Sequence, residues 1–404
     1  MVDSHFAPIC PYHQGGDERK SACPPEAAPG TIVVEKLGLA RQILRSDRVK
    51  QAGFRAELLE RFGRREHAPV LYQGGEAHQK QRRAIARFFA PKIVSGHYRA
   101  LMERLSDRLI ERLRKTRRAQ LDLMSLDIAV AVAAEIVGLT ESSLPRMARR
   151  LNRFFTANAQ VQTPRAVLAA FVLAQWRLLQ FYLWDVRPAI GARRRRPRED
   201  VISHLIARGR SHREILTECL TYGAAGMVTT REFIVMAAWH LFERDALTAR
   251  FLADDETGRI AILEEILRLE PVVGALYRRA EHDLALEDAG ETIHIPAGSL
   301  LALDVRHANA DSAAGEYPHQ LDPDRMRSPL HLSGSLISFG DGPHRCPGAS
   351  VALQEAAIFL ERLFRVPGIK LETAPALAWN PTIAGYELRG AIVTAGCPPT
   401  SVDS

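Results

Sequence analysis

One cysteine, Cys346, lies in the stretch of the chain that is richest in residues able to do chemistry. The loop around it reads Ser-Phe-Gly-Asp-Gly-Pro-His-Arg-Cys-Pro-Gly-Ala-Ser from Ser338 to Ser350, and a helix-like run, Val351 to Leu363, follows. Glycines and prolines at this density hold the backbone on a fixed path that carries little side-chain bulk. A thiolate near a helix N-terminus is favoured by free N–H groups and by the helix dipole. The loop therefore suits an iron-bound thiolate, and an inert cysteine in a surface loop is the alternative.

The order Phe339, Gly342, His344, Cys346 and Gly348 is similar to the haem-ligand loop of the cytochrome P450 family. The resemblance implies that the cysteine binds haem iron as a thiolate, while the phenylalanine shields the sulfur. It also implies that the histidine reaches a haem propionate and that the glycines let backbone N–H groups approach the sulfur. A thiolate axial ligand pushes electron density onto the iron and favours O–O cleavage.

Length and cysteine usage limit the class of protein. The chain has 404 residues, 46% of them hydrophobic, and no long polar linker divides it, so we expect one haem-thiolate domain over 31–404. Residues 1–30 are rich in proline, glycine and charge and are predicted to form a poorly ordered arm. The five cysteines are widely scattered, unlike a disulfide framework. No Cys-x-x-Cys-His occurs, so haem b would be held non-covalently.

The net charge and the hydropathy of the chain indicate which partners and which cellular location to expect. The net charge is +7, and an arginine run, Arg193 to Arg196, is expected to lie in a solvated loop between helices. No nucleic-acid motif accompanies this run, so no nucleic-acid partner is predicted. The most apolar stretch, 166–184, is interrupted by Gln175, Arg177 and Gln180, so we predict no membrane partner. No signal-peptide pattern opens the chain, and a cytoplasmic protein is expected.

A long helical pattern over 213–244 carries Gly223-Ala-Ala-Gly-Met-Val-Thr-Thr at its centre. Two glycines inside a helix cost about 1 kcal/mol each relative to alanine, so we expect a close approach or a local bulge. In the resembled family this helix crosses the distal face of the haem, and a threonine hydroxyl there can bond the carbonyl one turn back. The catalytic candidates that the resemblance implies are Gly226, Thr229 and Thr230.

The acid that usually precedes this threonine in the family is Val228 here, which cannot relay a proton. Glu232, three residues after Thr229, could replace the acid or could be a surface residue. The resemblance therefore leaves two chemistries open. One is monooxygenation, and the other is the same fold with peroxide-driven oxidation, oxidative coupling or reduction of a small molecule.

Basic residues upstream and downstream resemble the propionate-binding groups of the family. His78 and Arg82 are four residues apart and therefore lie on one face of a predicted helix that opens after Gln73. In the family, a histidine and an arginine at this spacing bind the haem propionates by charge-assisted contacts. Arg278 occupies the place of a further propionate-binding arginine, with Arg279 as its rival.

Glu265 and Arg268 form a Glu-x-x-Arg pair at helical spacing, which by itself is a weak signal. With Cys346 at a suitable distance downstream, the pair resembles the buried Glu–Arg pair of the family. The resemblance gives it a structural role in supporting haem binding, and Arg325 is the candidate third member.

Together these resemblances imply a mainly α protein with the cytochrome P450 fold, a large helical region and a small β-rich region. The implied activity is insertion of one oxygen atom from O2 into a largely apolar small organic substrate. The chain contains no flavin or iron–sulfur region, so electrons would come from a separate ferredoxin or flavodoxin and its reductase. A basic surface would steer that encounter. A haem-binding sensor is the alternative from another class of function.

Overall fold

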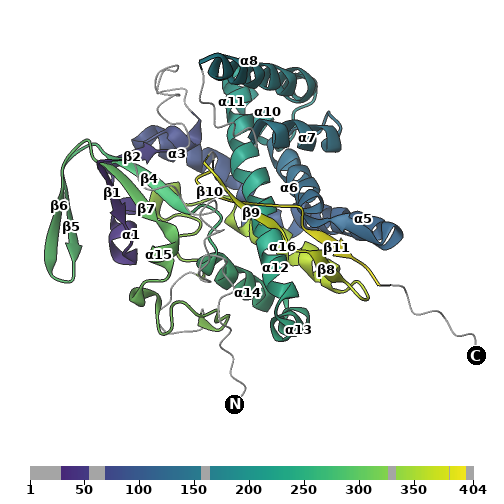
Figure 1. The fold of residues 1–404 in the computed structure, drawn as a ribbon. Helices are drawn as coiled ribbons and strands as arrows, with labels where there is room; N and C mark the ends of the chain where they lie inside the picture. The colour runs from purple at the N-terminus through teal and green to yellow at the C-terminus, as the bar shows by residue number, and fades with distance from the viewer. Residues whose placement is uncertain (1–28, 54–68, 156–163, 326–333, 382, 397–404) are drawn as a thin grey trace, which may run out of the picture.

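The computed structural model describes residues 29–53, 69–155, 164–325, 334–381 and 383–396. Helices make up most of this part of the chain, and short strands form a smaller region (Figure 1). The predicted fold class, mainly α with a small β-rich part, is therefore confirmed. The predicted N-terminal arm lies almost entirely outside the described residues.

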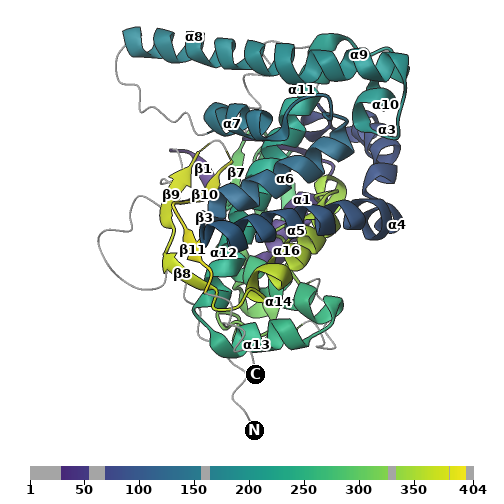
Figure 2. The same cartoon turned by 90° about the vertical axis from the view of Figure 1, so that its right-hand side faces the viewer.

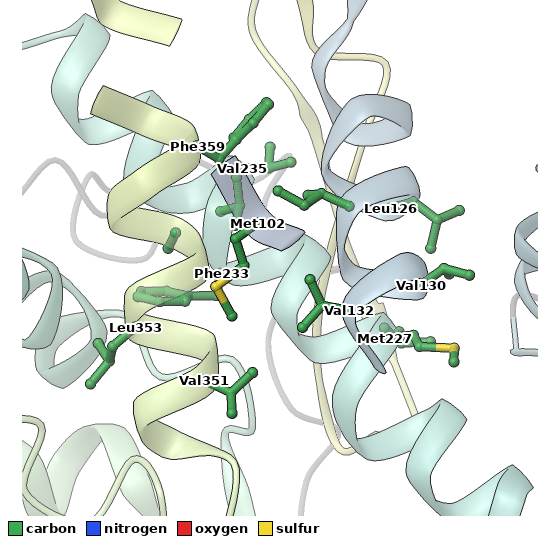
Figure 3. Close-up of a cluster of buried hydrophobic side chains, with 14 of the residues drawn as sticks. Met102, Leu126, Val130, Val132, Met227, Phe233, Val235, Val351, Leu353 and Phe359 are labelled. Carbon is green, nitrogen blue, oxygen red and sulfur yellow. The ribbon is translucent and has the colours of Figure 1, made fainter. Parts of the chain in front are cut away.

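Four long helices make the centre of the molecule. They are α5 (Arg99–Thr116), α6 (Leu121–Val137), α12 (Thr229–Phe242) and α16 (Ala349–Phe364). α6 and α12 are apolar on nearly all sides, which is the pattern of a helix enclosed by others. In Figure 3, Met102 of α5, Val132 of α6, Val235 of α12 and Phe359 of α16 meet in this core. α14 (Glu256–Leu269) packs against α16.

The long distal helix that the sequence predicts over 213–244 is present as three consecutive segments. They are α11 (His212–Tyr222), a π-helical segment η7 (Gly223–Val228) and α12. A π-helical turn inside an α-helix widens the backbone and frequently marks a functional site. The expected local bulge at the two glycines is therefore confirmed.

A four-stranded sheet lies beside the helical body, in the order β1-β7-β4-β2. Its strands are β1 (Thr31–Val34), β2 (Val49–Ala52), β4 (Ala275–Ala280) and β7 (Leu300–Asp304). β1 and β7 are parallel, and the other pairs are antiparallel. The sheet and the hairpin of β5 (Leu284–Asp288) and β6 (Glu291–Ile295) enclose a second core with α1 (Leu37–Arg45).

The C-terminal part of the chain adds two small sheets on another side of the helices. β3 (Arg118–Gln120), β11 (Ile392–Thr394) and β8 (Lys370–Thr373) form one of them. β9 (Ala376–Asn380) and β10 (Gly385–Arg389) form the other, and β10 contacts α12. This contact brings the end of the chain to the distal helix.

A ridge of helices crosses the top of the molecule in Figure 2. It consists of α7 (Leu144–Phe155), α8 (Pro164–Phe181), the π-helical η6 (Tyr182–Val186), α9 (Arg187–Arg195) and α10 (Val201–Ala207). The arginine run was predicted to lie in a loop, but most of it forms the last turn of α9. Arg193 is buried and ion-paired with Asp200 and Glu141, because a carboxylate on each neighbouring segment offsets its charge. None of the described helices is long and apolar enough to cross a membrane.

Candidate functional site

The loop that carries Cys346 is held in a tight path against α1. The Cys346 N–H donates to the Phe339 carbonyl over 2.8 Å, just before α16 begins. Gly340 and Gly342 have left-handed φ angles of 72° and 65°. A Cβ atom on Gly342 would lie 2.5 Å from the carbonyl oxygen of Leu44. Only glycine fits there, which agrees with the path expected from the sequence.

The surroundings of the Cys346 sulfur suit a metal-bound thiolate. Burial raises the pKa of the thiol, while the Gly348 N–H and the guanidinium groups of Arg82 and Arg345 lower it. Arg82 is itself fixed, because its guanidinium donates to the Arg345 carbonyl. A metal cation deprotonates a coordinating thiol outright. The donors at this site would then stabilise the sulfur charge.

A cluster of basic side chains, two histidines and two arginines, lies next to the loop. The His78 ring, from α3 (Gly75–Ala86), stacks on His344 with centroids 4.0 Å apart, and Arg82 follows one turn later on α3. Burial, followed by neighbouring positive charge, lowers the pKa of His78 to about 4 and that of His344 to about 3. Arg278 is one of the charged groups that depress the His344 pKa. Segments far apart in the sequence thus bring these four groups together.

This cluster has the composition expected of an anion site. Burial lowers the pKa of Arg278 to about 10, and the side chain is only 4% exposed. Within the described residues, no carboxylate forms an ion pair with Arg278 or Arg82. Burying cations without counter-charge is costly. A dianion with two carboxylates, as haem carries, fits this donor set.

The structure also distinguishes between the two candidate arginines on β4. Successive side chains on a strand point to opposite faces. Arg278 points into the protein, while Arg279 is more exposed and donates to the Gly298 carbonyl over 2.9 Å. Arg278 is therefore the one that lies with the basic cluster.

The distal helix places Thr229 where the π-helical segment ends. Its hydroxyl donates to the Ala225 carbonyl over 2.6 Å, which is the backbone contact expected from the sequence. Gly226 is not required by a close approach, because an added Cβ would meet its nearest atom, on Ala133, at 3.8 Å. Thr230 is 7% exposed and lies on a different face of the helix from Thr229.

Glu232 is neither a surface residue nor a free acid. The side chain is fully buried, and its carboxylate lies 2.7 Å from Arg231 and 2.8 Å from Arg389. It also accepts a 2.7 Å hydrogen bond from the Leu388 N–H on β10. Two arginines and a backbone N–H engage both oxygens of this carboxylate, so it is committed to joining β10 to α12. Val228, also buried, adds only apolar surface.

Another buried acid on this helix was not singled out from the sequence. Glu218 of α11 accepts hydrogen bonds from the Val70 N–H (3.2 Å) and the Gln81 amide (2.6 Å) through one oxygen. Its other oxygen has no hydrogen-bond partner among the described residues, and burial raises its pKa to about 7. Burial raises the pKa of Tyr222, one turn later; the nearby Glu218 also raises it, and Arg82 lowers it. An acid inside a largely apolar helical pattern is the signal that could have identified it.

The predicted brace is assembled as a buried cluster. Two nitrogens of Arg268 each lie 2.7 Å from the Glu265 carboxylate, and Arg325 lies 3.2 Å from it. Arg268 also donates to the Asn309 carbonyl, and the Asn309 amide donates to Ser338 Oγ over 2.7 Å. Asn309 thus connects the brace to the start of the cysteine loop, a role that the sequence did not indicate.

Comparison with known proteins gives a consistent result. The family model "Cytochrome P450" matches residues 260–367, which include the brace and the cysteine loop. The plant-inducible cytochrome P450-pinF1 of Rhizobium radiobacter is 27% identical over 305 residues, 73% of this chain and 68% of the relative. Nocardicin C N-oxygenase of Nocardia uniformis subsp. tsuyamanensis is 28% identical over 309 residues, covering 74% and 72% of the two chains.

Solved structures share the fold at lower identity. CalO2 superposes with a TM-score of 0.76 at 19% identity and covers 94% of both chains. The cytochrome P450 enzyme CYP109B1 from Bacillus subtilis gives a TM-score of 0.73 at 21% identity, covering 90% of this chain and 93% of that one. The chain belongs to the cytochrome P450 family, the haem monooxygenases that hold haem b non-covalently through a cysteine thiolate.

Proposed function

We propose that Cys346 is the haem ligand and that the enzyme inserts one oxygen atom from O2 into a largely apolar small organic molecule. The observation that carries this proposal is the site around the sulfur. A cysteine whose sulfur is approached by a backbone N–H lies beside two stacked histidines and two arginines, and no carboxylate among the described residues forms an ion pair with either arginine. His78, Arg82, Arg278 and His344 would neutralise the propionates. Phe339 and Gly348 would flank the sulfur.

The thiolate-bound haem, when present, supplies the reductive activation of dioxygen. Thr229 then has a positional role on the distal side. Its hydroxyl proton is committed to the Ala225 carbonyl, so its oxygen lone pairs remain free to accept a hydrogen bond from a water or substrate hydroxyl. The π-helical segment opens the backbone at this point and gives such a water room. Glu265, Arg268 and Arg325 act at a distance, by holding the segment that leads into the loop.

Electrons for this reaction would come from an acidic ferredoxin or flavodoxin and its reductase. Arg83 of α3, Arg87 directly after α3 and Arg345 next to Cys346 have exposed side chains. Positive charge at this location would steer an acidic partner toward the closest approach to the haem. The rate of reduction should fall as salt is added, and Arg83→Glu should reduce it further at low salt.

The test of the ligand assignment is the spectrum of the reduced carbon monoxide complex. The wild-type protein should give the red-shifted band that thiolate ligation produces, and Cys346→Ala should lose it. Cys219→Ala is the matched control, because Cys219 is a buried free cysteine on α11. A thiolate-type band retained by Cys346→Ala would refute the assignment.

A second chemistry on the same fold is supported by the distal side. Val228 replaces the usual acid, and the carboxylate of the nearest following acid, Glu232, is occupied by contacts with two arginines. Proton delivery through this part of the helix is therefore weak, which favours peroxide-driven oxidation, oxidative coupling or small-molecule reduction. Product yield with a reconstituted electron supply should be compared with the yield from hydrogen peroxide alone. Equal yields would favour the second chemistry.

A haem-binding sensor is the remaining alternative. It predicts ligand-induced shifts of the haem spectrum without consumption of any organic compound. A spectral screen of the ferric protein, followed by product analysis of each compound that binds, separates the two.

A further inference from the structure

The ridge over α8 and η6 exposes an unusual amount of apolar surface. Among the described residues, eight of the thirteen exposed large hydrophobic side chains fall within 168–184. Phe171 is 60% exposed, Trp176 55% and Trp184 63%. Isolated exposed apolar residues are ordinary, but a contiguous group of this kind marks an interaction surface.

The spacing of these side chains shows how the surface is arranged. Leu168, Val172, Trp176, Leu179 and Leu183 are separated by four, four, three and four residues, which places them along one side of the helix. Phe171, Leu173 and Trp184 are also exposed and lie on the flanks of this row. The apolar surface therefore wraps around much of the helix. In Figure 2 this helix runs along the top of the molecule and extends past α7.

The same ridge carries a strong positive charge. From α7 to α10, residues 144–207 contain twelve arginines and three acidic residues, Asp185, Glu199 and Asp200, for a net charge of +9, whereas the whole chain has +7. Asp185 is buried in an ion pair with Arg150. Eight of the arginines are exposed, and they lie on α7, on α9 and just beyond it: Arg146, Arg149, Arg153, Arg187, Arg194, Arg195, Arg196 and Arg198.

We propose that this ridge docks the enzyme on the surface of an anionic phospholipid bilayer. A helix that exposes tryptophan, phenylalanine and leucine beside arginines has the composition of an interfacial membrane helix. Lipid is the partner that the shape favours, because fluid acyl chains can surround a helix that is apolar on several sides. A rigid protein surface would cover only one side. Charge disfavours a second copy as the partner, since pairing two ridges would bring +9 against +9.

This contact is peripheral and needs no spanning helix. The sequence-based prediction of no membrane partner considered only segments long enough to cross a bilayer. Trp176 and Trp184 would enter the headgroup region, and the arginines would remain among the lipid phosphates. Binding should therefore depend on both anionic lipid and salt.

The test is flotation of the haem-loaded protein with vesicles of phosphatidylcholine and phosphatidylglycerol, mixed roughly three to one. The wild-type protein should float with these vesicles at low salt, stay behind with pure phosphatidylcholine, and show a blue shift of tryptophan emission on binding. Trp176→Ser with Trp184→Ser should weaken binding about 10-fold. Arg194→Gln, Arg195→Gln and Arg196→Gln together should weaken it on the order of 100-fold.

Two control variants alter matched features elsewhere on the surface. Leu123→Ser removes an exposed apolar side chain from α6, and Arg104→Gln, Arg108→Gln and Arg114→Gln remove three exposed charges from α5. Both should bind vesicles almost as the wild type does. The proposal is overturned if vesicles are not bound, or if ridge and control variants bind equally. A dimer in solution that Trp176→Ser with Trp184→Ser dissociates would assign the ridge to a second copy instead.

Discussion

Replacing Glu265 by glutamine tests the brace most directly. The carboxylate receives two 2.7 Å contacts from Arg268, one 3.2 Å contact from Arg325 and a 3.0 Å hydrogen bond from the Asp322 N–H. Glu265 and Arg268 are almost completely buried. Glutamine preserves the size of the side chain but removes its charge. Arg268 would then remain buried without a counter-ion.

The expected loss of stability follows from that geometry. Breaking a buried ion pair by removing one partner costs about 3–5 kcal/mol, because an uncompensated charge is left inside. Glu265→Gln should therefore lower the free energy of unfolding by about 3–5 kcal/mol. The loss should also reduce haem retention, because Arg268 and Asn309 connect the brace to Ser338 at the start of the cysteine loop.

The assay is urea unfolding of the haem-loaded variant, with the haem spectrum and far-UV circular dichroism recorded together. Glu372→Gln is the control, since both oxygens of Glu372 accept hydrogen bonds from Arg118 at an exposed position. Exposed pairs contribute little, so this variant should unfold almost as the wild type does. If Glu265→Gln and Glu372→Gln unfold at the same urea concentration, the buried charge does not stabilise the protein as argued.

Three further predictions concern the distal helix and the cysteine loop. Burial raises the pKa of Glu218 from 4.5 to about 7, so the folded state binds the extra proton and stability should fall as pH rises from about 4.5 to 7. Glu218→Gln should flatten this part of the stability profile by on the order of 3 kcal/mol, and an unchanged profile would contradict the assignment. Thr229→Ala should lower the product formed per electron consumed by roughly 10-fold, while Thr230→Ala should change it little; equal effects would remove the special role of Thr229. Gly342→Ala should destabilise the protein by about 3 kcal/mol or more, because its Cβ would overlap the Leu44 carbonyl, whereas Gly290→Ala, with φ of 90° and open space, should cost only about 1 kcal/mol. Thermal unfolding of both glycine variants checks this, and equal losses would rule out the overlap.

The cysteine loop and the bulged helix could be predicted from the sequence because their signals are local. Glycine and proline around Cys346 restrict the backbone directly, and two glycines inside an apolar helical pattern predict an irregular turn. The spacing of His78 and Arg82 likewise determines that they share a helix face. Each of these conclusions needs only a few neighbouring residues.

Other features depend on segments that are distant in the sequence. The choice of Arg278 over Arg279 as the propionate-binding candidate required the orientation of β4, because this orientation decides which of the two side chains points inward. Glu232 could not be recognised as ion-paired, because its partner Arg389 comes from a strand 157 residues later. Similarly, the raised pKa of Glu218 results from its burial in the folded chain, which hydrogen bonds from the distant Val70 and Gln81 offset only in part.

The sequence by itself therefore determined the residue types at the haem site, the mainly helical class and the absence of the usual acid at Val228. The tertiary structure decided which charges are compensated and which are not. The physical reason is that burial and counter-charge are set by packing between distant segments, whereas backbone restriction is set by neighbours in the chain. The apolar ridge of α8 is a further example. Its sequence did not show whether these side chains are buried, and their exposure in the folded molecule is what points to a partner.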